Sequence, residues 1–259
     1  MSQEQSTDGA HSSADAVSSV NAAPGGALAI LYRDPRLVAV YKPAGLLVHR
    51  TALDPDRDVA LQRVRDQLGG QWVYPVHRLD RATAGVLVFA RDPEAAGELA
   101  AAFREQRVTK RYEAVVRGWI EEAGAVDRPL GPGRRGGGGE PQPAHTDFQP
   151  LAHCELPIPV SRYASARYTR LALWPHTGRQ HQLRRHMKAI SHPIVGDTTH
   201  GDGAHNRLFR QHFAARRLLL WATRLELPHP EDGRQLSIVS EPDALLCTIL
   251  RDAGLALSP

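Results

Sequence analysis

The feature that most constrains the fold is the apolar run Ala84–Ala90, which is AGVLVFA and contains no polar side chain. Apolar residues on consecutive positions, several of them β-branched, are typical of a strand covered on both faces. Within the run, Val86–Phe89 therefore predicts a central strand of a sheet with further layers on each side. The 259 residues are 42% hydrophobic, which is enough for a sizeable core in one large domain or two small ones.

Segments around this run predict other strands and helices. The Asp34-Pro35 turn separates two short apolar runs, which indicates a hairpin, and Asp92 before Pro93 is typical of a helix start. The strands and helices alternate irregularly, without βαβ regularity or a GxGxxG motif, so we expect an α+β fold with a mixed sheet. The predicted elements are a hairpin of 28–32 and 37–45, a helix within 91–106, strands at 112–116 and 166–174, and a helix within 178–188.

Two segments are predicted to be without regular structure. Residues 1–26 are rich in Ser, Ala and Gly, and such a segment buries too little surface to offset the entropy of ordering, so we expect a disordered tail. Residues 131–145 are too rich in Gly and Pro for anything but a mobile loop, and no Gly-Lys-Ser/Thr marks a phosphate-binding loop there. Residues 27–259, which include this loop, are predicted to form the folded domain.

Targeting signals and cysteines indicate the compartment. No apolar run reaches the roughly 20 residues that span a bilayer, and residues 1–26 contain no Lys or Arg and no apolar block. We therefore expect no membrane anchor or secretory signal, and a cytoplasmic protein. Cys154 and Cys247 lack the spacing of a zinc site or a disulfide framework and are expected to be ordinary thiols.

Positive charge is concentrated in two segments. The formal net charge is +4, and 178–188 carries four cations and no acid, while 104–112 is also rich in Lys and Arg. Leu183, Met187 and Ile190 recur at i, i+4 and i+7, which predicts a helix that packs on one side and presents cations on the others. Such a surface suits a polyanionic partner.

One acid occupies a suggestive position. Asp80 lies between Arg78 and Arg81, directly before the apolar run. The neighbouring cations favour its ionised form, which a nucleophile or base requires. A structural ion pair would leave the same pattern, and the residues alone do not decide between the two.

The sequence lacks the residue patterns that several other kinds of catalytic site require. Of the thirteen histidines, His181 and His186 are five apart and do not share a helix face, and neither HExxH nor a His/Cys cluster occurs, so we predict no metal site. No Ser or Cys lies in a nucleophile-elbow context. A glycosidase-type hydrolase acting on nucleosides would normally need a second carboxylate.

Five motifs together form a resemblance. In order they are YKPAGLLVH (41–49), HRLDRATAGVLVFA (77–90), KRYEAVVRG (110–118), GRQHQLRRH (178–186) and HPIVGD (192–197). The set resembles that of the RluA-type pseudouridine synthases, from about residue 36 to residue 230. The resemblance implies their fold, a mixed, mostly antiparallel central sheet flanked by helices with a basic cleft. It also implies their reaction, in which a uridine of RNA is detached at its N1–C1′ bond, rotated and rejoined through C5 without cofactor or metal, by an enzyme expected to be monomeric.

The resemblance also implies roles for individual residues. Asp80 matches the catalytic aspartate, and Tyr112 matches a tyrosine whose ring can stack on uracil. Arg184 matches the partner of the aspartate, with Arg179 as the rival candidate. Arg78 matches the residue expected to enter the RNA where the uridine has flipped out. The RNA-binding residues expected on this basis are Arg78, Arg81, Lys110, Arg111, Arg179, Arg185 and Lys188.

Smaller features narrow the expected substrate. LVHRTALD, QPAHTDFQPLA and GDTTHGD are similar to members that modify uridine 65 in the T-stem of tRNA. A member acting on ribosomal RNA, and a catalytically silent RNA-binding protein of the same fold, stay open as alternatives. Three positions depart from the pattern of many relatives: Ala84 stands for Ser, Trp221 for His, and His200 for Tyr.

Overall fold

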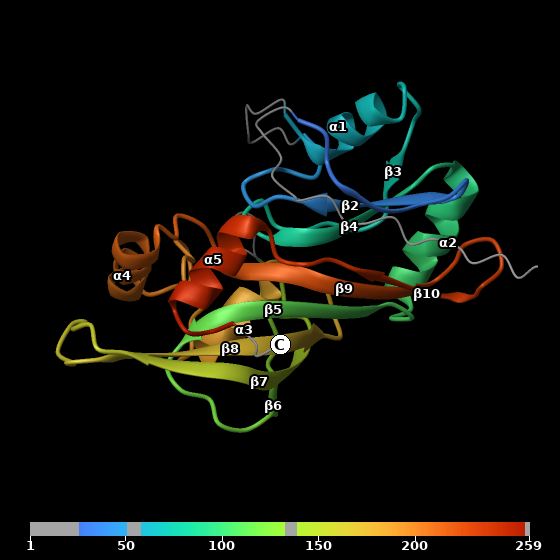
Figure 1. Cartoon of the computed structure of the whole chain (residues 1–259). Helices are drawn as coiled ribbons and strands as arrows, with labels where there is room; N and C mark the ends of the chain where they lie inside the picture. The colour runs from blue at the N-terminus through green and yellow to red at the C-terminus, as the bar shows by residue number, and fades with distance from the viewer. Residues whose placement is uncertain (1–25, 51–57, 133–138, 257–259) are drawn as a thin grey trace, which may run out of the picture.

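The strands of the described residues form one sheet at the centre of the molecule, with helices on both sides (Figure 1). The computed structural model describes residues 26–50, 58–132 and 139–256. The strands are β1 Ile30–Arg33, β2 Leu37–Lys42, β3 Tyr74–Pro75, β4 Ala84–Ala90, β5 Thr109–Arg117, β6 Gly124–Asp127, β7 His145–Leu156, β8 Ala166–Pro175, β9 Leu220–Pro228 and β10 Gln235–Val239. The helices are α1 Ala60–Gln67, α2 Pro93–Arg104, α3 Gln182–Ala189, α4 Gly203–Phe213 and α5 Ala244–Asp252.

The sheet is mixed and mostly antiparallel, as predicted. Its strands run in the order β1-β2-β4-β9-β5-β8-β7-β6, with β3 beside β4 and β10 beside β9. Among the strand pairs of the described ranges, only β4 and β9 are parallel, through Ala84 opposite Trp221 and Gly85 opposite Ala222. This junction joins the N-terminal strands to the rest of the sheet. The expected α+β class is therefore confirmed.

Strand β4 is central and covered on both faces. All seven of its residues are buried. Leu87 and Phe89 belong to an apolar cluster that includes α1, while Val86 and Val88 pack with α2 on the other face. A strand in this position must be apolar at every residue, which is why AGVLVFA could be recognised from the sequence.

The other predicted elements also form. The hairpin consists of β1 and β2, and the strands expected at 112–116 and 166–174 lie within β5 and β8. Helix α2 begins where expected, because the Asp92 carboxylate accepts the N–H of Ala95 at 2.8 Å and Pro93 is at the first helical position. Helix α3 packs Leu183 and Met187 against β5 and β8.

The segment predicted as a mobile loop, 131–145, is partly described. Residues 131–132 and 139–144 contain no helix or named strand, although Leu130 and Gln142 form an isolated bridge. His145 is the first residue of β7 rather than part of the loop, because it pairs with Asp127 of β6. Residues 133–138, and the predicted tail apart from its last residue, lie outside the described residues.

The cysteines and the helices can be compared with what the sequence predicts. Cys154 and Cys247 are both free thiols. In the part of the chain that the structure describes, no helix has the length and apolar character needed to cross a bilayer.

Two of the departures from the family pattern are neighbours. Ala84 and Trp221 lie opposite each other where β4 meets β9, and neither side chain is exposed. The small alanine faces the largest side chain of the core at this position. The guanidinium of Arg170 lies 5.6 Å from the centre of the Trp221 ring.

Gly85 is predicted to be indispensable for the β4–β9 junction. Its φ is +111°, and a Cβ there would lie 2.1 Å from the backbone oxygen of Ala222. We expect Gly85→Ala to lower the free energy of unfolding by about 3 kcal/mol or more, since the strands must separate and the backbone is strained. Urea denaturation followed by circular dichroism measures this change.

Gly97 provides the matched control. It lies in α2, is exposed, and a Cβ there meets nothing within 4 Å. Gly97→Ala is expected to stabilise the protein by up to about 1 kcal/mol, because alanine is the better helix former. Equal effects of the two substitutions would contradict the assigned role of Gly85.

Candidate active site

Asp80 lies in the turn between β3 and β4. The N–H of Thr83 donates to the Asp80 carbonyl at 3.0 Å, which closes the turn just before β4 begins. The Asp80 side chain is 23% exposed, so its carboxylate is accessible without being fully solvated. The position follows from the sequence, since HRLDR directly precedes the central strand.

A buried lysine ties this turn to the YKPAG segment. Lys42 has no exposed surface, and its Nζ donates to the carbonyls of Pro43, Leu46 and Arg81 at 2.9, 2.8 and 3.2 Å. Burial lowers the pKa of Lys42 to about 7, while the charge of Asp80 acts in the opposite direction. The N–H of Gly45 also donates to the Arg81 carbonyl at 2.7 Å. These bonds hold the turn that carries Asp80.

Arg184 of α3 connects Asp80 to a second, buried carboxylate. Its Nε and Nη2 donate to the two carboxylate oxygens of Asp197 at 2.7 and 2.8 Å, and its Nη1 lies 3.3 Å from Oδ2 of Asp80. Burial acts to lower the pKa of Arg184, but Asp197 and Asp80 more than offset it and hold that pKa above its usual value. The predicted pairing of Asp80 with Arg184 is thus present in the structure. Arg179, the rival candidate, donates instead to the carbonyl of Pro143.

Asp197 also accepts hydrogen bonds from two backbone N–H groups. Its Oδ1 also accepts the N–H groups of Thr199 and His200 at 2.8 and 2.9 Å. Burial acts to raise the pKa of Asp197, but Arg184 and these N–H groups hold that pKa below its usual value. Sequence reasoning quoted HPIVGD without assigning its aspartate a role. The HPIVGD motif was the only feature of the sequence that could have pointed to Asp197.

Tyr112 of β5 lies on the face of the sheet that α3 covers. It packs against two apolar clusters, one around β4 and one around α3. Burial, and then the negative charge of Asp80, raise the pKa of its hydroxyl well above the usual value. The side chain is therefore a neutral phenol within the field of the aspartate.

A pair of histidines also borders Asp80. His181 precedes α3 in the left-handed backbone conformation, with φ of 52°, and its Nε2 lies 3.9 Å from Oδ2 of Asp80. Its Nδ1 hydrogen bonds with Nε2 of His200 at 3.1 Å. Burial lowers the pKa of both imidazoles, so both are neutral at pH 7. Sequence reasoning assigned neither of them to the site.

The predicted RNA-binding residues differ in their surroundings. Arg78 and Lys188 are exposed, and the side chain of neither has a hydrogen bond or ion pair to another described residue. The remaining cations on the α3 side donate to backbone carbonyls. They are Arg81 to Gly45, Lys110 to Thr177, Arg179 to Pro143 and Arg185 to Gly131.

Arg111 lies on the opposite face from Tyr112. Successive residues of a strand point to opposite faces, and Arg111 shares its face with Glu113. Its Nη1 lies 2.7 Å from the Glu113 carboxylate and 3.0 Å from the hydroxyl of Thr223. Glu113 is buried and also pairs with Arg170, so the structure does not bring Arg111 to the candidate site.

The comparisons with known proteins identify the family. The family described as RNA pseudouridylate synthase matches residues 36–189. The chain belongs to this family. It is 48% identical over 235 residues to tRNA pseudouridine synthase C of Vibrio cholerae serotype O1, which covers 88% of this chain and 96% of that protein. It is 49% identical over 235 residues to tRNA pseudouridine synthase C of Salmonella typhimurium, with 88% and 90% covered.

Solved structures agree with this family. Human RNA Pseudouridylate Synthase Domain Containing 1 superposes with a TM-score of 0.69 and 29% identity over 90% of each chain. The expected pseudouridine synthase fold is confirmed. The chain is an RNA pseudouridine synthase, an isomerase that acts on uridine in RNA.

The buried Asp197–Arg184 pair predicts a large stability effect. The Asp197 and Arg184 side chains are only 1% and 7% exposed. Asp197→Asn leaves the buried guanidinium without its carboxylate partner, which we expect to lower the free energy of unfolding by about 3–5 kcal/mol. Equilibrium denaturation at pH 7 measures this loss.

Asp202→Asn is the matched control. Asp202 pairs with Arg117 at 2.6 Å, but the two side chains are 28% and 35% exposed. Asn retains the ability to cap α4, so a change within about 1 kcal/mol is expected. If both substitutions lower the free energy of unfolding equally, the Asp197–Arg184 pair does not contribute the large stabilisation expected of it.

Proposed function

We propose that this chain converts uridine 65 in the T-stem of tRNA to pseudouridine, with Asp80 as the catalytic carboxylate. The observation that carries the proposal is the position of Asp80, partly exposed and 3.3 Å from a guanidinium that Asp197 fixes from behind. The relatives named tRNA pseudouridine synthase C, about half identical over most of the chain, support tRNA as the substrate.

The reaction requires few groups. The N1–C1′ bond breaks, a C5–C1′ bond forms, C5 loses a proton and N1 gains one, so the product is an isomer and no redox partner is needed. In the proposal Asp80 acts as an ionised carboxylate that attacks C1′, adds to C6 or abstracts a sugar proton. Arg184 supports each of these roles, because its charge stabilises the carboxylate and its fixed position orients it.

Tyr112 is proposed to contact the base. A neutral, mostly buried ring near the charge of Asp80 would offer a stacking surface for uracil, and its hydroxyl is proposed to take part in removing the proton from C5. Arg78 is proposed to occupy the space that the flipped uridine leaves, since it is exposed, near Asp80 in sequence, and unpaired among the described residues.

The RNA backbone is proposed to lie along a basic cleft beside α3. Lys188 offers an exposed ammonium, while Lys110, Arg179 and Arg185 offer charges whose carbonyl partners do not neutralise them. Arg81, which follows Asp80 in the sequence, is proposed to contact the same RNA. Action as a monomer is part of the proposal. The tRNA substrate supports a cytoplasmic location, and the proposal requires no cofactor.

Asp80→Asn tests the catalytic assignment. Asparagine keeps the shape of the side chain but cannot serve as an anionic nucleophile or base, so we expect pseudouridine formation to be abolished while RNA affinity stays within a few-fold. Tritium release from C5-labelled transcripts measures the reaction, and filter binding measures the affinity. A substantial residual rate would remove Asp80 from its proposed role.

The same assay separates the alternatives when tRNA and ribosomal RNA are compared. Release from tRNA alone, mapped to position 65, supports the proposal. Release only from ribosomal RNA would keep the chemistry and replace the substrate. Tight binding without release would favour a silent RNA-binding protein, and turnover of free nucleosides would favour a hydrolase.

Lys188→Ala tests the RNA-binding face. Removing one phosphate contact is expected to weaken tRNA binding and to reduce the slope of log K against log salt by about one unit at most. Arg251→Ala is the matched control, because Arg251 is an exposed cation on α5, which packs against the other face of the sheet. An unchanged slope for Lys188→Ala, or an equal change for Arg251→Ala, would refute a direct contact by Lys188.

A further inference from the structure

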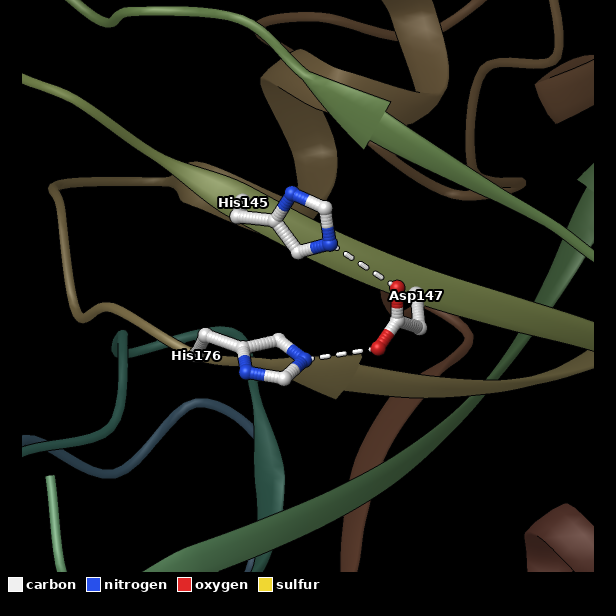
Figure 2. A group of neighbouring side chains, drawn as sticks. All are labelled: His145, Asp147 and His176. Atoms are coloured by element: carbon white, nitrogen blue, oxygen red, sulfur yellow. Dashed lines mark hydrogen bonds and ion pairs between the residues drawn. The ribbon is translucent and has the colours of Figure 1, made fainter.

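Three side chains with metal-binding atoms converge where β7 begins and β8 ends (Figure 2). His145 and Asp147 lie on β7, and His176 directly follows β8. Nε2 of His145 is 2.9 Å from Oδ1 of Asp147, and Nε2 of His176 is 2.6 Å from Oδ2. The three ligand atoms all lie within 4.8 Å of one another, which is the only such group of His, Cys, Asp or Glu in the described residues.

The backbone places these side chains together. His145 and Asp147 are two residues apart on one strand and so point to the same face. Thr146 pairs with Pro175, and the N–H of His176 donates to the carbonyl of His145 at 3.0 Å, which extends the ladder by one residue. The two imidazoles meet edge to face with centres 4.9 Å apart. The arrangement therefore does not depend on a long flexible side chain.

The donor set matches one class of cation. Two imidazole nitrogens and one carboxylate oxygen are ligands of Zn²⁺ and of similar borderline ions, whereas Mg²⁺ prefers an octahedron of oxygens. Bonds of about 2.0–2.1 Å in a tetrahedron put neighbouring ligand atoms roughly 3.4 Å apart. The three ligand atoms lie within 4.8 Å of one another, so bringing their longest separation to about 3.4 Å needs shifts of the side-chain tips on the order of 1 Å.

Protonation does not prevent binding. Each imidazole donates its Nε2 proton to Asp147, and Nδ1 of neither ring has a hydrogen bond to a described residue. A cation can therefore take the two Nε2 atoms if each proton moves to Nδ1, which faces no competing donor among these residues. The side chains are 38%, 44% and 53% exposed for His145, Asp147 and His176, so an ion reaches them from solvent.

We propose that His145, Asp147 and His176 form a binding site for a divalent cation of the zinc class, with a fourth position open to solvent. The site is distinct from the group around Asp80, and the proposal goes beyond the isomerisation of uridine. It differs from the expectation of no metal site, which considered only residues close in sequence.

The cation would brace the segment that leads into α3. The carbonyl of His145 accepts both the N–H of His176 and the side-chain N–H of Gln182, the first residue of α3. The side chain of Gln182 also accepts the N–H of Arg179 at 3.0 Å. An ion that links β7 to His176 would therefore hold both ends of the turn that carries Arg179.

Calorimetric titration of the full chain with Zn²⁺ tests the proposal. After removal of bound metal with a chelator at pH 7.5, we expect one equivalent to bind and to raise the melting temperature, because a ligand of the folded state stabilises it. His176→Ala and Asp147→Ala should each bind that equivalent at least tenfold more weakly. Lowering the pH to 5.5 should weaken binding in the wild type, since protons compete for the imidazoles.

The controls exclude other sites and other ions. His212→Ala removes an exposed histidine of α4 and should bind Zn²⁺ like the wild type. Mg²⁺ should not bind at the same concentrations. Absence of Zn²⁺ binding, equal binding by wild type and His176→Ala, or equal binding of Mg²⁺ would each overturn the proposal. Melting curves without metal confirm that the variants fold.

Discussion

The two-point contact of Asp197 with Arg184 is the interaction on which the candidate site depends. It uses two of the three guanidinium nitrogens, so the remaining one, Nη1, has a fixed direction toward Asp80. A buried ion pair of this kind recovers its desolvation cost only when its geometry is good, and its main effect is then to orient charge. The same aspartate holds the N–H of His200, whose imidazole contacts His181 beside Asp80. One buried carboxylate thus fixes the guanidinium beside Asp80 and the backbone N–H of the histidine that contacts His181.

The backbone supports this arrangement from the other side. Strand β4 can approach β9 only because Gly85 has no side chain, and the turn before β4 is fixed by Lys42 through the Arg81 carbonyl. Ala84 and Trp221 fill the space at the same junction, and neither side chain is exposed. The aspartate is therefore held by its own turn, and the arginine is held by α3 and Asp197.

Local patterns made the central elements predictable, and long-range contacts explain what was missed. The apolar run of β4 and the Asp-Pro start of α2 depend on neighbouring residues, so both could be recognised. Asp197 acts on an arginine thirteen positions earlier and Lys42 on carbonyls of another motif, and neither contact leaves a local signature. His145 and His176 come together only through the pairing of β7 with β8. The alternation of β5, however, already separates Arg111 from Tyr112, and it could have been used.

Each cationic side chain is available to a polyanion to a degree that depends on its partner in the protein. A carbonyl acceptor immobilises a guanidinium without cancelling its charge, so Arg179 and Arg185 keep their field while losing little further entropy on meeting a phosphate. Arg111 and Arg170 share the single negative charge of Glu113, so their combined charge is partly cancelled on the opposite face. The sequence alone does not distinguish arginines that have carbonyl partners from arginines that have carboxylate partners. The structure divides them by partner: Arg179 and Arg185 donate to carbonyls, whereas Arg111 and Arg170 pair with a carboxylate.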